Sequence, residues 1–294
     1  MSGERRRDLL YGVMFTSPWI IGFTVFMAVP LVLSFYFSFC DYSILNAPVY
    51  VGAQNYQDMM QDEVFWKTLR NTFYFAALSL PLGTVLALGL ALLLNTDLFG
   101  RAFFRTLFFL PSLVPLVALA ILWREMLHVE YGIVNTLMRS IGFETIDWLG
   151  DPRHAMHGLV FSSLWGVGNA TVLYLASLQD VPRGLYEAAE VDGANAWQRM
   201  VHVTLPMISP VIYFNLLMGC IGSLQVFALP YVMTKGEPAR STMFYAMYLF
   251  DQAFSYLNMG YASAMAWVLF ILIAGLSFLA HLLSKRYVHQ GDGS

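Results

Sequence analysis

Six long runs without a charged residue or a histidine constrain the fold of this chain more than any other feature. Each run has at least 18 residues, and a helix needs roughly 20, within a range of about 17–25, to cross a bilayer. The runs cover residues 9–40, 71–96, 106–123, 158–179, 203–234 and 252–280. Charged residues make up only 12% of the chain, against about 25% in soluble domains. The sequence therefore predicts an all-α membrane protein with six transmembrane helices.

Lysine and arginine are unevenly distributed between the two sets of connections, and this predicts the orientation of the spans. The shorter set, which has nine of the 16, consists of residues 1–8, 97–105, 181–202 and 281–294. Arg5, Arg6 and Arg7 directly precede the first run, and such basic flanks stay in the cytoplasm. We therefore expect both termini and the 181–202 connection to be cytoplasmic. The first run is too long for a signal peptide and lacks a small-residue cleavage site, so we expect it to be retained as a span.

The chain shows no internal repeat and no segment with the composition of a soluble domain. We therefore expect a single transmembrane domain over residues 1–294, with core spans at about 70–285. The longest external connection, 124–157, has room for one short interfacial helix around Ile133–Ser140. The net charge of −3 gives no reason to expect a nucleic-acid partner. Cys40 and Cys220 lie in apolar runs, where a free thiol behaves as a small hydrophobic group.

One polar stretch, LYEAAEVDGANAWQRMVHVTLP, interrupts the apolar sequence at residues 185–206. Good helix formers predict a helix from Arg183 to Val191, with Pro182 near its first turn. Asp192-Gly193 supplies a stop, because glycine readily adopts the left-handed conformation that ends helices. A second helical stretch, 194–203, is expected to follow until Leu205-Pro206 begins the next span.

The acidic residues of this loop bear on what it contacts. A loop that lies on lipid headgroups usually presents lysine or arginine on its polar face. The first helix instead has Glu187, Glu190 and Asp192, while Ala188 and Ala189 would let another surface approach the backbone closely. An amphipathic loop on lipid and a protein-docking loop are both open, and the acidic face favours the protein partner.

The same stretch resembles the EAA loop of ABC-importer permeases. The pattern is Glu187-Ala188-Ala189, three residues, Gly193, nine residues and then VTLP at 203–206, where Val203 replaces the isoleucine of the family pattern. The chain also resembles the MalF-like carbohydrate permeases, in their shorter six-span form, along most of its length. The similar segments are 17–42, 51–75, 108–127, 131–138 and 234–238, with Glu237 in the last where the family usually has glycine.

The resemblance implies a type I ABC importer permease fold with a coupling helix, in a prokaryotic inner membrane. It also implies three kinds of protein partner: a second permease subunit that completes the pore, two ATPase subunits, and an extracytoplasmic solute-binding protein. The loop at 183–203 would sit in a cleft of one ATPase subunit. Its coupling residues would be Glu187, Ala188, Ala189, Asp192, Gly193, Leu205 and Pro206. The chain has no GxxxxGK[ST] phosphate loop, so we expect no enzymatic activity and no cofactor here, with ATP and Mg bound by the ATPase subunits.

Small and polar residues recur at helical spacing in the fourth and fifth runs. Ser162, Gly166, Asn169 and Leu173 share one face, and a second stripe begins at Asn215. Such stripes either pack helices together or line a pathway. Maltose-type permeases bind sugar through these two spans, and the resemblance places Gly166, Asn169, Gly219, Ser223 and Val226 near those positions. The predicted substrate pathway consists of Gly166, Asn169, Asn215, Gly219, Ser223, Gln225 and Val226.

The stripes contain no ionised side chain, which suits a neutral carbohydrate, such as an oligosaccharide, better than glycerol phosphate or another charged solute. Tyr174, Phe214 and Phe227 could stack on a sugar or simply pack. Two other classes of protein stay open: an intramembrane enzyme, for which no nucleophile–base pair is apparent, and a membrane scaffold. His154 and His157 lie near Asp151, but without a third ligand at a suitable spacing they do not make a metal site.

Overall fold

A computed structural model describes residues 3–96 and 99–287, of which residues 3–6, 8, 9, 286 and 287 are described by backbone alone. Arg5, Arg6 and Arg286, which entered the orientation argument, therefore have side chains outside the described set. The chain divides into two compact units. Unit 1 contains Met1–Asp62 and Leu249–Ile271, and unit 2 contains Glu63–Tyr248 and Leu272–Ser294. Helix α15, Met259–Tyr287, runs through both.

Unit 1 begins with one long apolar helix. It is built from α1 (Gly3–Phe23), a π-helical turn (Thr24–Ala28) and α2 (Val29–Phe37). A short antiparallel ladder follows, in which β1 (Cys40–Asp41) pairs with β2 (Val49–Tyr50), with Cys40 opposite Tyr50. The other elements of unit 1 are α3 (Gln54–Gln61), a π-helical turn (Asp251–Ser255) and the first part of α15.

The turn after α2 is held by a buried amide. Asn55 of α3 donates from Nδ2 to the carbonyl oxygens of Ser38 and Cys40, at 2.9 Å each. Gly260 of α15 lies against the same turn, because a Cβ there would meet the Cys40 carbonyl oxygen at 2.0 Å. Cys40 is fully buried and, like Cys220, is a free thiol.

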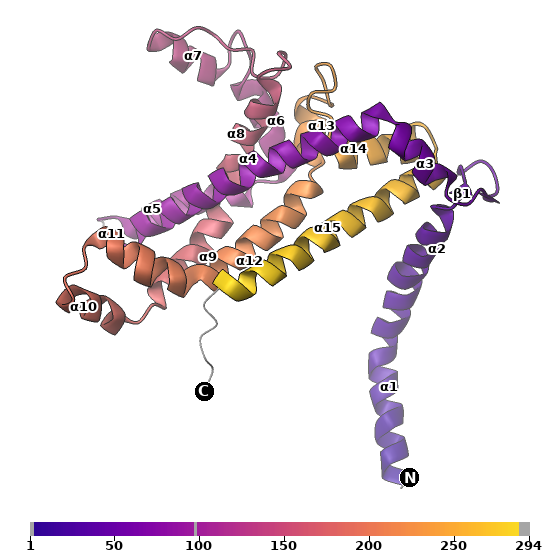
Figure 1. Cartoon of the computed structure of the whole chain (residues 1–294), viewed down its shortest axis with the longest axis horizontal. Coiled ribbons are helices and arrows are strands. Elements are labelled where there is room, and N and C mark those ends of the chain that lie inside the picture. The colour runs from indigo at the N-terminus through magenta and orange to yellow at the C-terminus, as the bar shows by residue number, and fades with distance from the viewer. Residues whose placement is uncertain (1–2, 97–98, 288–294) are drawn as a thin grey trace. The chain divides into compact units, whose positions relative to one another are not determined.

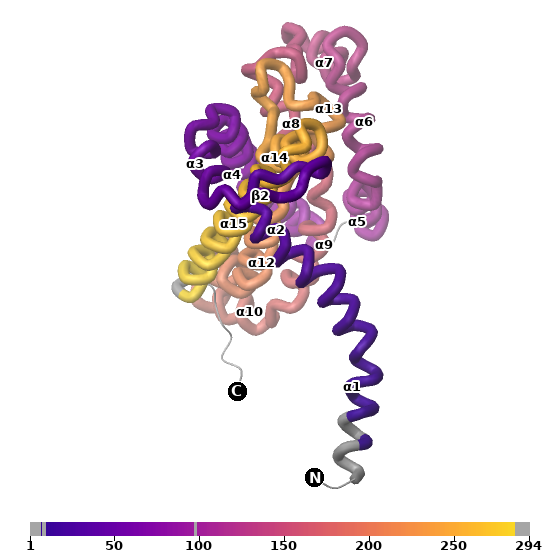
Figure 2. Tube along the Cα trace, turned by 90° about the vertical axis from the view of Figure 1, so that its right-hand side faces the viewer, coloured from indigo at the N-terminus to yellow at the C-terminus, as the bar shows by residue number. Residues whose placement is uncertain are grey.

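Unit 2 contains the remaining helices (Figures 1 and 2). Three elements are long or bent spans: α4 (Glu63–Leu94), the pair α5 (Arg101–Phe109) and α6 (Leu116–Met126), and the pair α8 (Ala155–Ser163) and α9 (Gly168–Gln179). The polar loop forms α10 (Arg183–Val191) and α11 (Ala196–Arg199), and α12 (Leu205–Leu224) follows. The short helices are α7 (Ile133–Ser140), α13 (Ala228–Met233) and α14 (Tyr245–Phe250), whose last two residues belong to unit 1.

The described residues contain four continuous helices that are long and apolar enough to cross a membrane, and two bent pairs that meet the same criterion. The continuous ones are Leu10–Phe37, Glu63–Leu94, Ala196–Leu224 and Met259–Lys285. Counting each bent pair as one span gives the six that the sequence predicts. The expected short helix at Ile133–Ser140 is also confirmed, with those bounds.

Two spans differ from the straight helices that their apolar runs suggest. The third bends by 100° between Leu113 and Leu116. Val114 is extended there (φ −73°, ψ 129°), because the ring of Pro115 disfavours the helical conformation of the residue before it. The fourth bends by 47° between Gly166 and Gly168. The 203–234 run is likewise divided, since α12 ends at Leu224 and α13 is separate.

The second helical stretch of the polar loop also differs from its expected bounds. It begins at Ala196 and passes through a π-helical turn, Met200–Thr204, directly into α12. The wider turn accommodates Pro206, because the Leu205 amide donates to the Met200 carbonyl five residues back. The second helix of the polar loop, α11, and the fifth span are therefore one continuous helix rather than two.

Gly168 lies in close contact with the third span at the bend of the fourth span. A Cβ at Gly168 would lie 2.6 Å from the Phe108 carbonyl oxygen and 3.1 Å from the Phe109 Cα, both backbone atoms that cannot move alone. We predict that Gly168→Ala lowers the free energy of unfolding by about 1–3 kcal/mol through overpacking, seen as a lower melting temperature in detergent. Gly89→Ala is the matched control, because no described atom lies within 4 Å of its Cβ position. Equal melting temperatures for the two variants would contradict the close contact.

Candidate functional site

An open cavity of about 490 Å³, lined by both polar and apolar side chains, lies in unit 2 between α4, the bend of the α8–α9 span and α12. Its lining comes from these three spans alone: Ser79, Leu80, Gly83, Thr84, Gly166, Val167, Asn169, Ala170, Tyr174, Asn215, Met218 and Gly219. The α4 and α12 spans, far apart in the sequence, run side by side here (Figure 1). The lining contains hydroxyls, two amides and small residues, and no charged side chain.

The cavity lies midway between two apolar clusters. The α7-side cluster has as its buried members Phe75, Leu119, Ala120, Trp123, Leu127, Met156, Leu159, Val160, Leu229, Met233, Phe244 and Met247. The α10-side cluster consists of Ala87, Ala91, Leu94, Tyr174, Leu175, Leu178, Val181 and Ile208. Along α4 the order is Phe75, then the cavity residues Ser79–Thr84, then Ala87, and the α8–α9 span repeats it. Along α12, Ile208 of the α10-side cluster precedes the cavity residues, and buried members of the α7-side cluster follow only in α13. Helices α7 and α10 lie at opposite ends of unit 2 (Figures 1 and 2).

The two amides that line the cavity are available to a ligand to different degrees. Asn169 is exposed, and its side chain forms no hydrogen bond with any other described residue. Asn215 donates one hydrogen bond from Nδ2 to the Val211 carbonyl oxygen of its own helix, at 3.0 Å. Amide groups both donate and accept, so this lining can bind a solute that carries hydroxyl groups.

The structure brings together four of the seven residues predicted for the substrate pathway: Gly166, Asn169, Asn215 and Gly219. The other three lie outside the cavity. Ser223 is buried and donates to the Cys220 carbonyl oxygen at 3.0 Å. Gln225 is the exposed C-cap of α12, and Val226 packs against the α7-side cluster. A pathway role for these three stays a prediction.

The two cavity glycines have different surroundings. Apart from its chain neighbours and its own helix, no described atom lies within 4 Å of a Cβ placed on Gly166, so its missing side chain leaves open space. A Cβ on Gly219 would lie 2.8 Å from Leu80 Cδ2, so that glycine permits the close approach of α12 to α4. Gly219 therefore combines a packing function with its place in the lining.

Sequence reasoning missed the α4 wall. Ser79, Gly83 and Thr84 of the second apolar run line the cavity, and none of them is among the predicted pathway residues. Ser79 and Gly83 stand four residues apart, which puts them on one helical face. That spacing was the available signal.

Helix α10 of the polar loop has the predicted stop, and its geometry is a Schellman motif. Gly193 has a φ of 75°. Its amide donates to the Glu190 carbonyl at 3.0 Å, and the Ala194 amide donates to the Ala189 carbonyl at 2.9 Å. Asn195 then starts α11 with a capping box, in which its side chain and that of Gln198 exchange hydrogen bonds with each other's backbone amides. All four backbone amides of the turn, 192–195, therefore donate a hydrogen bond.

Two contacts attach α10 to the helix that leads into α12. The Tyr186 hydroxyl bonds the Thr204 hydroxyl at 3.0 Å, and Glu190 pairs with Arg199. The Tyr186 ring also packs against the α10-side cluster. Leu205 packs there too, and Pro206 lies in the first turn of α12.

The outward surface of the polar loop is unusually apolar for a water-facing segment. Val191 is 88% exposed and Trp197 is 70% exposed, while Glu187, Ala188, Asp192 and Gly193 are exposed beside them. Ala189 is half-buried and lines a shallow hollow of about 300 Å³ with Asp192 and Gly193. Exposed large apolar side chains within a rim of polar groups mark interaction surfaces.

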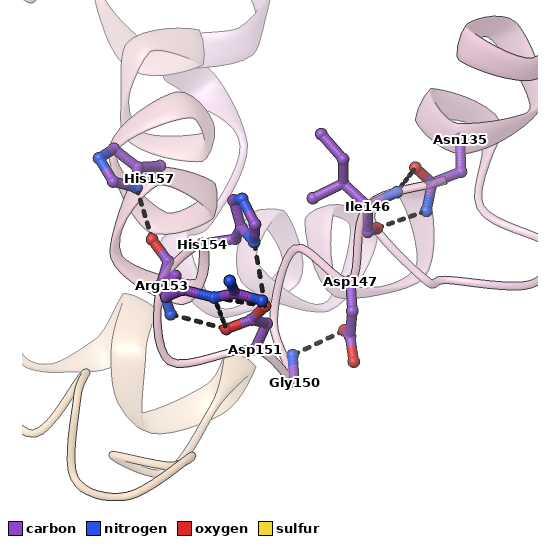
Figure 3. Close-up of polar contacts among 8 residues, drawn as sticks. All are labelled: Asn135, Ile146, Asp147, Gly150, Asp151, Arg153, His154 and His157. Carbon is purple, nitrogen blue, oxygen red and sulfur yellow. Dashed lines mark hydrogen bonds and ion pairs between the residues drawn. The ribbon is translucent and has the colours of Figure 1, made fainter. Parts of the chain in front are cut away.

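The connection at the other end of unit 2 is organised by one buried amide (Figure 3). Asn135 of α7 is fully buried. It donates to the Ile146 carbonyl at 2.9 Å and accepts from the Ile146 amide at 3.2 Å and from Trp148 Nε1 at 3.3 Å. These bonds join α7 to the 143–149 segment.

The two histidines considered for a metal have structural contacts instead (Figure 3). His154 Nδ1 lies 3.4 Å from Asp151 Oδ2, whereas His157 contacts the Arg153 carbonyl oxygen and the Tyr74 hydroxyl. Hydrogen bonds from Arg153 hold the pKa of Asp151 well below its ordinary value. The described residues contain no group of three or more His, Cys, Asp or Glu placed to hold a metal ion.

Residues 79–289 match the protein family described as "Binding-protein-dependent transport system inner membrane component". The chain is 39% identical over 289 residues to the probable ABC transporter permease protein YesP of Bacillus subtilis (strain 168), covering 97% of this chain and 93% of that protein. It is 35% identical over 282 residues to the lactose transport system permease protein LacF of Rhizobium radiobacter, covering 94% of each.

Among solved structures, a chain of a bacterial ABC transporter involved in the import of the acidic polysaccharide alginate is similar over almost the whole length. The TM-score is 0.84 at 25% sequence identity, and the match covers 97% of this chain and 98% of that one.

The buried amide at α7 gives a prediction about local order. We expect Asn135→Ala to leave the Ile146 backbone groups and the Trp148 indole without partners, at a cost of about 1–3 kcal/mol for a buried unsatisfied group. Hydrogen exchange should then show faster exchange of the 143–149 amides. The exposed Asn46→Ala is the control, since its side chain bonds only Ser43 among the described residues. Unchanged protection at 143–149 in Asn135→Ala would refute the anchoring role.

Proposed function

The chain belongs to the family of binding-protein-dependent transport system inner membrane components, the permeases of ABC transporters, and on this premise we propose that it moves a neutral carbohydrate through the cavity of unit 2. As a permease subunit it is the non-catalytic membrane component of the transporter. The observation that carries the proposal is the cavity lining, which has the unpaired amide of Asn169, the partly free amide of Asn215 and no charged group.

The position and size of the cavity support this role. It lies midway along three spans, between two apolar clusters, and transporter binding sites lie near the bilayer midplane between elements that rock against each other. Its volume of about 490 Å³ falls within the range of roughly 300–1,000 Å³ typical of small-molecule sites. Alternating access then requires one cluster to open while the other stays packed.

The chemistry of the lining favours a carbohydrate without charge. Lactose and alginate, the substrates named for two similar proteins, are both carbohydrates but differ in charge, so the relatives alone leave the charge undecided. A sugar hydroxyl donates and accepts, as amides and hydroxyls do. A phosphate or carboxylate would leave an unpaired charge beside this lining, and burying an unpaired charge is costly.

We assign the surface of α10 to contact with an ATPase subunit. Val191 and Trp197 are exposed there together with Glu187, and the two contacts at Tyr186 and Glu190 attach α10 to the fifth span. Movement of a docked subunit would thus be transmitted to Asn215 and Gly219 of the cavity through a continuous helix. The coupling residues are Glu187, Ala188, Ala189, Asp192, Gly193, Leu205 and Pro206.

The complete transporter would contain a second permease, two ATPase subunits that bind ATP and Mg, and an extracytoplasmic binding protein. The basic residues Arg5–Arg7 support a cytoplasmic position for both termini and α10, in a prokaryotic plasma membrane. The α7 end of unit 2 would then face outward, toward the binding protein.

A variant that fills the cavity tests the proposed transport role. Gly166→Leu directs a side chain into open space, so it should assemble normally and reduce sugar uptake at least about tenfold by occluding the site, a loss worth about 1.4 kcal/mol. Uptake is measured in proteoliposomes with all subunits and the binding protein, against a panel of lactose, maltose and glycerol 3-phosphate. Gly89→Leu, outside the cavity and equally unhindered, is the control. Full uptake by Gly166→Leu, or transport of glycerol 3-phosphate in place of the sugars, would refute the proposal.

Variants in and just after α10 test the docking surface. Gly193→Pro removes the amide that bonds Glu190 and requires a negative φ where the chain has 75°. Co-purification of the ATPase subunit in detergent should therefore weaken at least about tenfold, and Glu187→Arg should weaken it by reversing the charge.

Gly142→Pro is a closely matched control for the proline variant. It damages the equivalent turn after α7, where Gly142 has a φ of 87° and its amide bonds Arg139. ATPase association should survive in Gly142→Pro. If both proline variants lose the ATPase equally, or neither does, the docking assignment is wrong.

A further inference from the structure

Tyr174 of α9 has a buried hydroxyl without a partner. The residue is fully buried, and its hydroxyl oxygen forms no hydrogen bond with the described residues. Buried tyrosine hydroxyls normally find a partner, because an unsatisfied polar group in an apolar surrounding is costly. The ring packs in the α10-side cluster, which also excludes it as a stacking platform for a sugar. The orphaned hydroxyl therefore requires an explanation.

The place of Tyr174 in unit 2 supplies that explanation. It both lines the cavity and belongs to the α10-side cluster, so it marks the boundary between them. Thr84 of α4 lines the same cavity and lies near the Tyr174 hydroxyl. The two hydroxyls do not form a hydrogen bond of normal geometry. Two hydroxyls from different spans thus lie together at the end of the cavity next to the α10-side cluster.

We propose that Tyr174 and Thr84 form a specificity-determining hydroxyl pair, which binds one hydroxyl group of the carbohydrate at the α10 end of the cavity. This inference rests on the proposed function and extends it to a second wall of the site, beyond the amides of Asn169 and Asn215. A sugar hydroxyl can accept from Tyr174 and donate to Thr84 at once. Because the tyrosine hydroxyl is covered in this conformation, the contact forms when α4 and α9 part, a movement that alternating access supplies.

We expect the pair to affect the preference for one sugar over another more than it affects the affinity for any single sugar. A site built to bind a substrate hydroxyl rejects an analogue that lacks it, because its own buried polar groups are then left unpaired. Removal of one neutral hydrogen bond alters affinity by about three- to tenfold.

The test is Tyr174→Phe in the complete transporter, which removes the hydroxyl and keeps the ring. We expect uptake at low concentration of whichever sugar, lactose or maltose, the wild type transports better to fall about three- to tenfold. We also expect the wild type to discriminate against one monodeoxy analogue of that sugar, and the variant to lose this discrimination. Thr84→Val should do the same. The melting temperature of the sugar-free complex should hold or rise in Tyr174→Phe, since an unsatisfied buried group is removed.

Tyr213→Phe is the matched control, because Tyr213 lines an apolar groove of α12 and α15 away from the cavity. Unchanged uptake and unchanged analogue discrimination in Tyr174→Phe would overturn the inference. A fall in uptake with discrimination retained would assign Tyr174 a structural role and overturn it equally.

Asn169→Ala separates this inference from the proposed function. If Asn169→Ala reduces uptake and Tyr174→Phe does not, only the hydroxyl pair is wrong. If neither variant alters uptake, or if neither sugar is transported by the wild type, the cavity is not the carbohydrate site and the proposed function fails with it.

Discussion

The cost of placing an unpaired polar group among apolar atoms governs the architecture of unit 2. Polar side chains of the spans away from the cavity can be satisfied within their own helix: Ser162 donates to the Gly158 carbonyl, and Ser223 donates to the Cys220 carbonyl. At the cavity, by contrast, the side-chain amide of Asn169 and the hydroxyl of Tyr174 have no hydrogen-bond partner among the described residues. Both residues line the cavity between the two apolar clusters of unit 2.

Much of this arrangement could be predicted because the signals involved are local. The six spans follow from runs of apolar residues. Helix α10 follows from helix formers that end before a glycine, and its predicted end at Val191 agrees with the structure. Gly193 was identifiable as a stop because a left-handed residue is needed there whatever surrounds it. The stripe of Gly166 and Asn169 was also found, since periodicity within one helix needs no knowledge of its neighbours.

The features that escaped prediction depend on where helices end and which helices meet. The predicted pathway includes Gln225 and Val226, which lie beyond the end of α12 at Leu224, so helical spacing does not determine which way their side chains face. The wall formed by Ser79 and Thr84 became visible only once α4 was placed against α9 and α12, a pairing that hydropathy does not encode. The break at Val114 was signalled by Pro115, yet its 100° magnitude depends on tertiary packing.

The two-point attachment of α10 has a mechanical consequence. A short helix attached at one point could rotate about that contact. A force applied to its surface would then rotate the helix instead of moving the span to which it is attached. Tyr186 and Glu190, bonded to Thr204 and Arg199 respectively, leave only rotation about the line that joins the two contacts. Both partner residues belong to the helix that continues into α12. A displacement of α10 is therefore expected to move that span with it, with little independent rotation of α10.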